Sequence, residues 1–171
     1  YNIKPYNEEL HTGLVRHILI RIGAATGQIM VCIVCTRAKL PHSAELVEQL
    51  TAQFPDIATV LVNVNPRNTN VILGTETHTL CGPGFIEDTL CGVPVRLGPL
   101  SFYQVNPLAA ERLYGIAAEY AQLQPDDLLL DLYCGMGTIG LSMVDRCRSL
   151  IGVEIVPEAI DSAKANAARM G

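Results

Sequence analysis

The sequence lacks an excess of basic residues. It contains 12 lysine and arginine residues against 17 aspartate and glutamate residues, and its formal net charge is -5. Proteins that bind nucleic acid electrostatically usually present a basic surface. The acidic balance therefore argues against strong, autonomous binding of RNA or DNA by this chain.

Long uninterrupted apolar runs are also lacking. The longest apolar stretch, "ILIRIGAATGQIMVCIVC", is broken by Arg21, Gly23, Gly27 and Gln28. A transmembrane helix needs about 18 to 20 consecutive apolar residues, so no membrane span is expected. The opening "YNIKPYNEELHTG" has neither an initiating Met nor a basic region followed by an apolar stretch. We expect no signal peptide and interpret the sequence as the interior of a longer chain.

The cysteines lack the regular spacing of a small secreted framework. They are Cys32, Cys35, Cys81, Cys91, Cys134 and Cys147. We therefore expect free thiols in a reducing compartment, the cytoplasm. Cys32 and Cys35 form C-x-x-C on an expected strand, where residues i and i+3 face opposite sides and cannot converge on zinc. Cys81 and Cys91 are too isolated for a metal site, and no metal is expected.

What is present is enough apolar material for a substantial core, since 49% of the 171 residues are hydrophobic. Residues 14–22 and 29–36 are rich in β-branched side chains and flank the turn "GAATGQ", which predicts a β-hairpin. Residues 43–54, "SAELVEQLTAQF", predict a helix with Ser43 as its N-cap. Its expected apolar face consists of Leu46, Val47, Leu50 and Phe54.

The rest of the first half continues as strands. A strand is expected over residues 57–65, followed by a turn at "PRNT" and a return strand over residues 70–74. Further short strands are expected around "HTLCG", "GFIEDTLCG" and "VPVRLGP". Residues 1–98 are thus predicted to form an accessory α+β domain, a mixed sheet with one helix.

A different architecture is expected from residue 99 to residue 171. "NPLAAERLYGIAAEYAQL" predicts a helix that Asn106 caps and Pro107 begins. Next come, in order, a strand at Leu128 to Leu132, a helix from Thr138 to about Arg146, a strand "SLIGVEIV" and a helix from Pro157 towards Met170. This β-α-β-α order predicts a parallel sheet with right-handed crossovers. Two strands leave such a sheet incomplete, so we expect the first part of a Rossmann-like α/β domain.

The turn "GMGTIG" between the first of these strands and its helix matches G-x-G-x-x-G, which alone is a weak indication of nucleotide binding. Asp131 ends the strand before it, and a carboxylate there would repel a pyrophosphate but attract a cationic group. Gly135 and Gly137 would let a ligand approach the backbone closely. Glu154 ends the following strand, where an acidic residue can receive ribose hydroxyls. The pattern favours an adenosyl ligand with a cationic tail, such as S-adenosylmethionine.

Three motifs carry a resemblance to a known family. "SFYQVNPLAAERLY", "DLYCGMGTIGLSM" and "GVEIVPEAIDSAKANA" resemble the RNA 5-methyluridine (uracil-C5) methyltransferases, which act on ribosomal and transfer RNA. "HTGLVRHILIRIG" is similar to the segment before the catalytic domain in the bacterial 23S ribosomal RNA branch. The resemblance implies a Rossmann-like S-adenosylmethionine-dependent methyltransferase that forms 5-methyluridine, in ribosomal RNA rather than transfer RNA.

Carried over by position, the resemblance implies that Gln104, Tyr133 and Glu154 contact S-adenosylmethionine, with Thr138 beside them. Phe102 falls where the family places an aromatic side chain near the target base. Residue chemistry is compatible, because an amide can hydrogen-bond a cofactor or uracil and an aromatic ring can stack on an extruded base.

The family adds a cysteine thiolate to uracil C6 and removes the C5 proton with an acidic base, and both groups lie downstream of the segment seen here. The resemblance therefore implies that this chain has no catalytic residue and is inactive alone. No iron–sulfur cluster is expected either, because the family's cluster cysteines lie upstream. Cys134 is not the nucleophile by our interpretation, since no basic residue near it in sequence would lower its pKa.

Alternatives remain open at this point. One is an NAD(P)-dependent oxidoreductase that uses the "GMGTIG" turn, and another is a non-catalytic RNA-binding module. His11, Arg16 and His17 are candidates for a polar surface near substrate. Arg16, Arg67 and Arg96 are candidate phosphate contacts.

Overall fold

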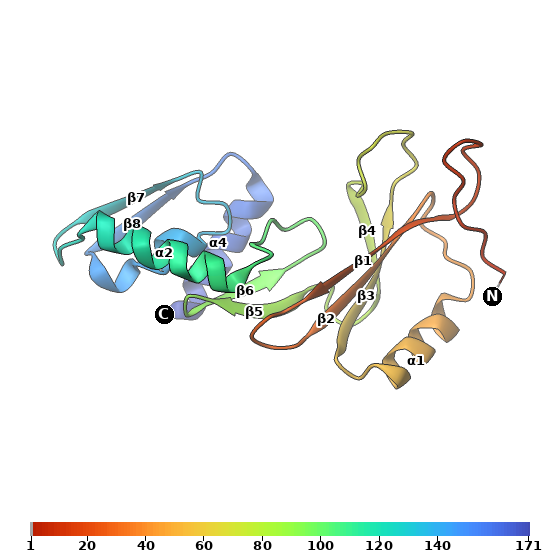
Figure 1. Ribbon diagram of the computed structural model, residues 1–171, viewed down its shortest axis with the longest axis horizontal. Coiled ribbons are helices and arrows are strands. Elements are labelled where there is room, and N and C mark those ends of the chain that lie inside the picture. The colour runs from red at the N-terminus through yellow and green to blue at the C-terminus, as the bar shows by residue number, and fades with distance from the viewer. Residues whose placement is uncertain (1) are drawn as a thin grey trace. The chain divides into compact units, whose positions relative to one another are not determined.

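A four-stranded sheet forms the centre of the first half of the chain in the computed structural model, which describes residues 2–171. The strand order is β1-β2-β3-β4, with β1 at Val15–Ile22, β2 at Ile29–Cys35, β3 at Ile57–Val64 and β4 at Glu76–Cys81. The β1–β2 and β3–β4 pairs are antiparallel. The β2–β3 pair is parallel, and helix α1 (Ser43–Gln53) connects its two strands (Figure 1). The predicted mixed sheet with one helix is confirmed.

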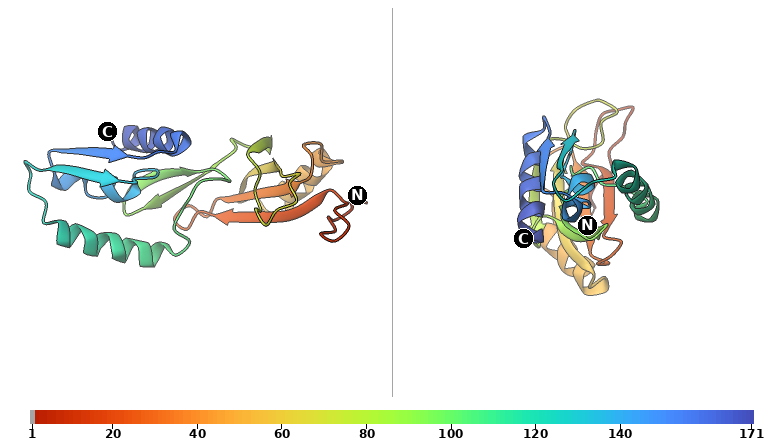
Figure 2. Two further views of the ribbon diagram at one scale, coloured as in Figure 1. Left: turned by 90° about the horizontal axis from the view of Figure 1, so that it is seen from above. Right: turned by 90° about the vertical axis from the view of Figure 1, so that its left-hand side faces the viewer.

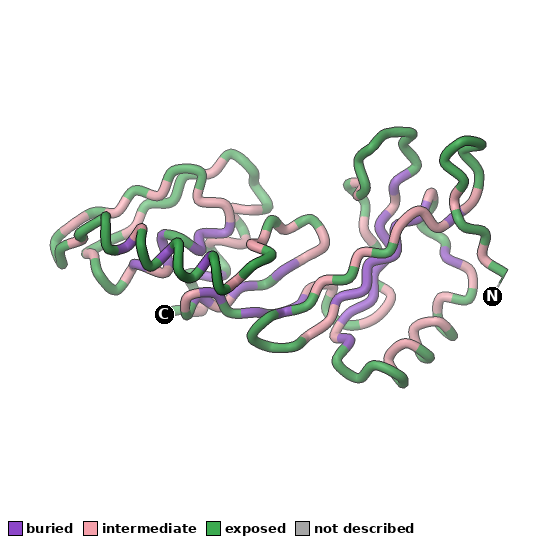
Figure 3. Tube along the Cα trace, in the orientation of Figure 1, coloured by how far each residue is buried: buried purple, intermediate pink, exposed green. Residues whose placement is uncertain are grey.

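The core of this first unit lies on β2 and β3, which are buried on both faces. Met30 and Val34 point to one face and are fully buried, while Val60 and Val62 are fully buried in the cluster on the other face. Figure 3 shows this burial along the two central strands. The expected helix residues Leu46, Val47 and Leu50 pack against that cluster. Each fully buried Val or Leu side chain contributes about 1.5 to 3 kcal/mol of transfer free energy.

Two details of the expected helix are wrong. Its N-cap is His42, in the left-handed region at φ 54° and without a side-chain cap hydrogen bond, rather than Ser43. The helix ends at Gln53, and Phe54 leaves helical geometry at φ -128°. The Phe54 side chain therefore departs from the apolar face and is 52% exposed.

The return strand expected over residues 70–74 is also wrong. Asn65 donates from Nδ2 to the carbonyls of Val71 (2.6 Å) and Ile72 (3.0 Å). Asn63 exchanges two hydrogen bonds with Gly74, at 2.9 and 2.7 Å. Side-chain amides thus occupy the backbone groups that a strand would use, and the segment forms a loop. The actual return strand, β4, begins at Glu76.

The second half contains two pairs of strands and three α-helices. The elements are β5 (Ile86–Leu90), β6 (Val93–Leu97), α2 (Pro107–Ala121), β7 (Leu128–Leu132), α3 (Thr138–Leu141), the 3-10 helix η1 (Val144–Arg146), β8 (Ser149–Val153) and α4 (Pro157–Met170). As expected, Asn106 caps α2, accepting at its side chain from the Ala109 N–H at 3.1 Å. Helices α2 and α4 lie on opposite sides of the β7–β8 pair (Figure 2).

Strands β7 and β8 are parallel and in register, from Leu128 beside Ser149 to Leu132 beside Val153. The predicted β-α-β-α segment is confirmed, and with it the fold class of an α+β part followed by a partial Rossmann-like methyltransferase segment. The helix expected from Thr138 to Arg146 is instead split. The Ser142 hydroxyl donates to the Ile139 carbonyl at 2.7 Å, and the Met143 N–H donates to Gly140, three residues back, at 3.1 Å. These bonds tighten the backbone and end the α-helix.

One face of the β7–β8 pair is apolar and half exposed. Its side chains are Leu128 (51% exposed), Leu130 (54%), Leu132 (57%), Ile151 (48%) and Val153 (48%). The register brings the side chains of the two strands onto the same face. The opposite face carries Asp131 towards α3.

Two compact units are distinguished within the chain. The first comprises the residues up to Gly23, Gly27–Ile86 and Gly98–Leu100, and the second comprises Ala24–Thr26, Glu87–Leu97 and Ser101–Gly171. The expected boundary between domains 1–98 and 99–171 stays a prediction, while the β5–β6 hairpin groups with the second unit from Glu87 on. Within residues 2–171, no helix combines the length and apolar character needed to cross a membrane.

Candidate cofactor site

The glycine turn after β7 is fastened to the end of β8. The Cys134 N–H donates to the Val153 carbonyl at 3.0 Å, and the Gly135 N–H donates to Glu154 Oε2 at 3.0 Å. Gly135 and Gly137 have φ angles of 56° and 84°, in the left-handed region that favours glycine. The predicted residues Gly135 and Glu154, far apart in sequence, are therefore in direct contact.

Glu154 is held by three backbone donors. Besides the Gly135 bond, its Oε1 accepts from the N–H groups of Ile155 (2.8 Å) and Val156 (3.0 Å). The bonds from Val156, Gly135 and Ile155 lower the pKa of this carboxyl below its ordinary value. Glu154 is thus an ionised and oriented acceptor at neutral pH.

Asp131 has the opposite environment. Its Oδ2 accepts from the Gly140 N–H at 2.9 Å, which ties the end of β7 to α3. Burial raises the pKa of the Asp131 carboxyl, and the Gly140 bond only partly offsets that rise. The two carboxyl groups around the turn thus differ in environment: backbone N–H donors lower the pKa of Glu154, whereas burial raises the pKa of Asp131.

Tyr133, between Asp131 and Gly135 in the sequence, has an uncommon backbone conformation. Its φ is 60°, in the left-handed region, and its side chain is 87% exposed. For a bulky residue this conformation costs about 1 to 3 kcal/mol and persists only where the surrounding structure imposes it. The ring is therefore displayed at the surface next to the glycine turn.

Thr138 and the turn itself are held from two helices. The buried Thr138 hydroxyl lies 3.3 Å from the hydroxyl of Tyr114 on α2. Asn166 of α4, 1% exposed, donates from Nδ2 to the Met136 carbonyl at 3.0 Å. Our sequence reasoning missed Tyr114 and Asn166. The sequence feature that could have revealed them is a polar group on a helix face that otherwise holds small apolar residues. Ala110 and Ala118, for example, lie one turn before and one turn after Tyr114 on α2.

Phe102 and Gln104 lie on the segment before α2. Phe102 is 79% exposed, and Gln104 is partly buried. Between them, Tyr103 packs against the cluster of Leu90, Ala110 and Tyr114. Tyr103 and Tyr114 thus connect this segment to Thr138, and the predicted residues Phe102 and Gln104 do not.

A cavity of about 260 Å³ lies on the α4 side of β7 and β8. Asp131, Cys134 and Gly137 contribute to its lining with the side chains of Leu150, Ile160 and Ala163. Gly135, Tyr133 and Glu154 are outside that lining. Of the predicted residues, Asp131 and Gly137 therefore line an apolar cavity, whereas Gly135, Tyr133 and Glu154 lie outside it.

Cys134 has the properties of a packed thiol. Burial, followed by the charges of Asp131 and Glu154, raises the pKa of its thiol. A raised pKa suppresses the thiolate that a nucleophile requires. Burial also raises the pKa of both Cys32 and Cys35 to about 11. Across residues 2–171, no three His, Cys, Asp or Glu side chains gather closely enough to hold a metal ion.

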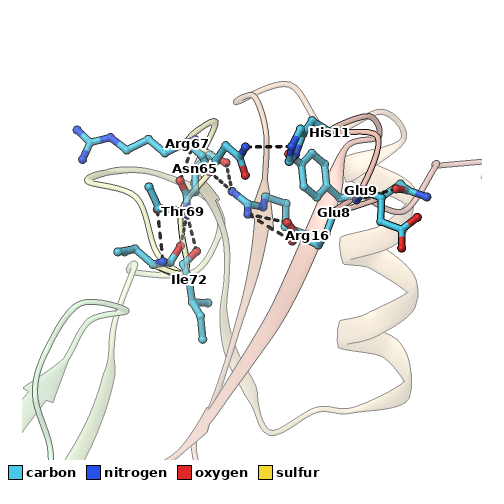
Figure 4. A network of polar contacts seen from close by, with 12 residues as sticks. Glu8, Glu9, His11, Arg16, Asn65, Arg67, Thr69 and Ile72 are labelled. Carbon is cyan, nitrogen blue, oxygen red and sulfur yellow. Dashed lines mark hydrogen bonds and ion pairs between the residues drawn. The ribbon is translucent and has the colours of Figure 1, made fainter.

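Arg16 was a candidate phosphate contact, and the structure corrects this, because only 2% of its side chain is exposed. Figure 4 shows its guanidinium between two segments: it donates to the Asn65 carbonyl at 3.2 Å and pairs with Glu8 at 3.3 Å. It also lies 4.6 Å from the centroid of the Tyr6 ring. Arg16 therefore holds the fold of the first unit together.

The other basic candidates differ among themselves. His11 bridges the Tyr6 hydroxyl (3.3 Å) and the Asn68 amide (3.0 Å). Arg96 pairs with Glu87 at 3.1 Å. The exposed Arg67 side chain points away from the Arg16 network in Figure 4.

The parallel β-α-β unit, its glycine turn and the acidic end of its second strand define a Rossmann-like fold of the class that binds adenosyl cofactors. Residues 94–170 match the family model described as tRNA (Uracil-5-)-methyltransferase. The resemblance to the RNA uracil-C5 methyltransferases is thereby confirmed.

Relatives cover nearly the whole chain. An uncharacterized RNA methyltransferase of Streptococcus mutans is 42% identical over 168 residues, which is 98% of this chain and 37% of that protein. Another from Clostridium tetani is 44% identical over 167 residues, which is 98% of this chain and 36% of that protein. The chain thus spans little more than a third of the length of these curated relatives.

Solved structures agree with the sequence comparison. The crystal structure of Pyrococcus abyssi tRNA (uracil-54, C5)-methyltransferase in complex with S-adenosyl-L-homocysteine superposes with a TM-score of 0.79 at 25% identity. That match covers 98% of this chain and 40% of that one. The similarity includes both units of the chain.

Proposed function

We propose that this chain is the part of an S-adenosylmethionine-dependent RNA (uracil-C5) methyltransferase that binds the cofactor and presents the target base. The observation that carries the proposal is the contact between Gly135 and Glu154, which builds an oriented carboxylate onto a glycine turn. The family match over residues 94–170 includes both residues. We call this chain together with the remaining length found in its relatives the full-length form.

The electrostatics of the turn favour this cofactor over a dinucleotide. Asp131 and Glu154 are both carboxyl groups close to the turn, and a pyrophosphate there would meet negative charge. S-adenosylmethionine carries an ammonium and a sulfonium group and no phosphate. The chemistry of the donor set therefore fits it, and NAD(P) is the weaker alternative.

The individual roles follow from position. Glu154, with three of its lone-pair directions taken by N–H donors, has acceptor capacity left for a ribose hydroxyl. A Cβ at Gly135 would project into open space, so glycine keeps the surface of the turn clear for a ligand. Tyr133, Thr138 and Gln104 complete the proposed cofactor contacts. When bound, S-adenosylmethionine supplies an electrophilic methyl group.

Asp131 and Gly137 belong to the inner side of the same proposed site. Asp131 orients α3 through the Gly140 N–H and adds negative charge for a cationic ligand. Gly137 faces Leu141 and Ala163, with a Cβ there reaching 3.2 Å from Leu141 Cδ1. Glycine therefore lets the turn pack closely on α3 and α4.

Phe102 is proposed to stack on the target uracil, because it is a largely exposed aromatic ring beside Gln104. The thiolate that adds to uracil C6 and the base that removes the C5 proton are proposed to come from the part of the full-length form outside this chain. The raised pKa of Cys134 supports this, since that thiol is a poor nucleophile.

The RNA substrate is proposed to be ribosomal, on the similarity of "HTGLVRHILIRIG" to the 23S ribosomal RNA branch. Transfer RNA is the alternative, favoured by the description of the family model and by the Pyrococcus abyssi enzyme. Cytoplasmic localisation is part of the same proposal, because those substrates are handled there.

The test uses the full-length form, S-adenosylmethionine labelled on the methyl group, and unmodified 23S ribosomal RNA and transfer RNA in separate reactions. We expect 5-methyluridine in the ribosomal RNA. If only transfer RNA is methylated, the proposed reaction stands, but the substrate is transfer RNA rather than ribosomal RNA. Binding of NADH without S-adenosylmethionine, or RNA binding without either small molecule, would contradict the proposal and favour an oxidoreductase or a binding module.

A further inference from the structure

A buried carboxylate in the second unit has no part in the site described so far. Asp88 lies on β5, whose residues alternate between buried and exposed, and it occupies a buried position with 2% of its surface exposed. Its neighbours on that buried face are Ile86 and Leu90. A carboxyl group at such a position is costly unless hydrogen bonds compensate for the lost water. Its partners therefore indicate why it is there.

Three donors converge on Asp88. Its Oδ1 accepts from the Ala25 N–H at 2.8 Å, and its Oδ2 accepts from the Ala24 N–H at 3.0 Å. The third donor is the hydroxyl of Tyr103, 2.9 Å from Oδ2. All these residues belong to the second unit. Asp88 thus joins the backbone of residues 24 and 25 to one tyrosine side chain.

Tyr103 is fixed at both ends of its side chain. The ring packs against Leu90, Ala110 and Tyr114, and the hydroxyl is bound to Asp88. Burial, followed by the bond to Asp88, raises the pKa of the phenol well above its ordinary value. The hydroxyl therefore keeps its proton and remains a donor to the carboxylate.

The residues on either side of Tyr103 are the two that the proposed function assigns to ligands. Phe102 is 79% exposed, whereas Tyr103 packs against the core cluster and Gln104 is partly buried. Peptide units are planar and rigid, so a fixed Tyr103 restricts the backbone of both neighbours. The directions of the Phe102 ring and the Gln104 amide then depend on the anchorage of Tyr103.

We propose that Asp88 is a positioning residue that, by accepting the Tyr103 hydroxyl, sets the direction in which Phe102 and Gln104 meet the target base and the cofactor. The inference rests on the proposed function, because that function supplies the two ligands. Asp88 itself touches neither ligand. It acts through one hydrogen bond and one aromatic anchor.

Two variants of the full-length form separate this role from a purely structural one. Tyr103→Phe keeps the ring and leaves both Ala24 and Ala25 bonded to Asp88, so the fold is retained. Asp88→Asn keeps the size of the side chain but replaces one acceptor oxygen with a donor. Asp127→Asn is the matched control, because Asp127 is a carboxylate of the same unit that accepts a backbone N–H, from Gln124 at 2.7 Å, outside the site.

The measurements are kcat and KM for RNA methylation, S-adenosyl-L-homocysteine affinity by calorimetry, and the melting temperature. For Tyr103→Phe we expect about a tenfold loss of kcat, equivalent to about 1.4 kcal/mol, with a nearly unchanged melting temperature. Asp88→Asn should lose at least as much. The double variant should lose no more than Asp88→Asn, because both changes break the same bond. Asp127→Asn should lower the melting temperature and leave kcat unchanged.

Each outcome decides between the two proposals. If Tyr103→Phe and Asp88→Asn change only the melting temperature, Asp88 is structural and the inference is wrong, while the proposed function stands. Additive losses of kcat in the double variant would also overturn the inference. If the unsubstituted full-length form neither binds S-adenosyl-L-homocysteine nor methylates RNA, the proposed function fails and the inference with it.

Discussion

In the first unit, a Cβ atom added at Gly74 would lie 1.8 Å from the Val64 carbonyl oxygen, whereas one added at Gly135 in the second unit would meet no described heavy atom within 4 Å. Gly74 is needed because the backbone at the end of β3 lies directly against it. Gly135 is needed because its φ of 56° favours glycine, while the space beside it is open. Glycine thus serves packing in one unit and leaves a surface accessible in the other.

The largest expected effect tests this contrast directly. Gly74→Ala should destabilise the chain by about 3 kcal/mol or more, because the new Cβ displaces backbone rather than a flexible side chain. Gly135→Ala should cost only about 1 to 2 kcal/mol, the penalty of the left-handed conformation for a residue with a Cβ. Urea denaturation of the 171-residue chain measures both. Equal losses would remove the distinction between the two glycines.

Glu154→Ala tests whether the accessible turn of the second unit binds a ligand. We expect about ten- to a hundredfold weaker S-adenosylmethionine binding by the full-length form, since a charged hydrogen-bond acceptor is lost. Calorimetry measures the affinity. The control is Glu119→Ala, which removes an exposed carboxylate of the same unit from α2. Unchanged affinity for Glu154→Ala would remove this residue from the site.

A smaller effect concerns a tight glycine contact beside the turn, that of Gly152 with Cys134. A Cβ at Gly152 on β8 would lie 2.9 Å from Cys134 Sγ. Gly152→Ala should therefore cost about 1 kcal/mol through overpacking, and adding Cys134→Ala should restore most of that loss. Cys134→Ala alone should leave methylation by the full-length form unchanged. Loss of methylation in that single variant would make Cys134 a catalytic group, against the present interpretation.

The smallest effect is a pH-dependent one at Asp131. Burial raises the pKa of this carboxyl in the folded state, so its ionisation opposes folding. The associated stability is present at acid pH and is lost as pH rises through the unfolded and then the folded pKa. Asp131→Asn should therefore raise the melting temperature slightly at pH 7 and match the unsubstituted chain at acid pH. A lower melting temperature at pH 7 would mean that the Gly140 bond outweighs burial.

The sequence predicted those parts of the fold that depend on neighbouring residues. Strand β7 has the expected bounds, and Asn106 with Pro107 begins α2 as their chemistry requires. The loop after β3 could not be predicted, because the amides of Asn63 and Asn65 reach backbone groups that a strand pattern assigns to a sheet. Local sequence patterns contain no information about which side chain will donate a hydrogen bond to a given backbone carbonyl.

The candidate site likewise contains features that local sequence patterns predict and features that they do not. That Asp131, Gly135 and Glu154 lie near one another could be predicted, because the ends of adjacent parallel strands meet at one edge of a sheet. Asp88 and Asn166 were missed, since their partners lie far away in sequence. Asp88 did leave a signal, a charged residue in the inward register of "IEDTL" between Ile86 and Leu90. A polar residue at a position that alternation assigns to the core indicates a partner from elsewhere in the chain.

The bond from Asn166 to the Met136 carbonyl has a consequence for the order of events during protein synthesis. The glycine turn leaves the ribosome well before α4, which carries the amide that holds it. At about 5 to 20 residues per second, translation takes some seconds to supply that helix. Until then the nascent turn lacks this restraint, and we expect it to become competent for its ligand only after α4 has been translated and has docked.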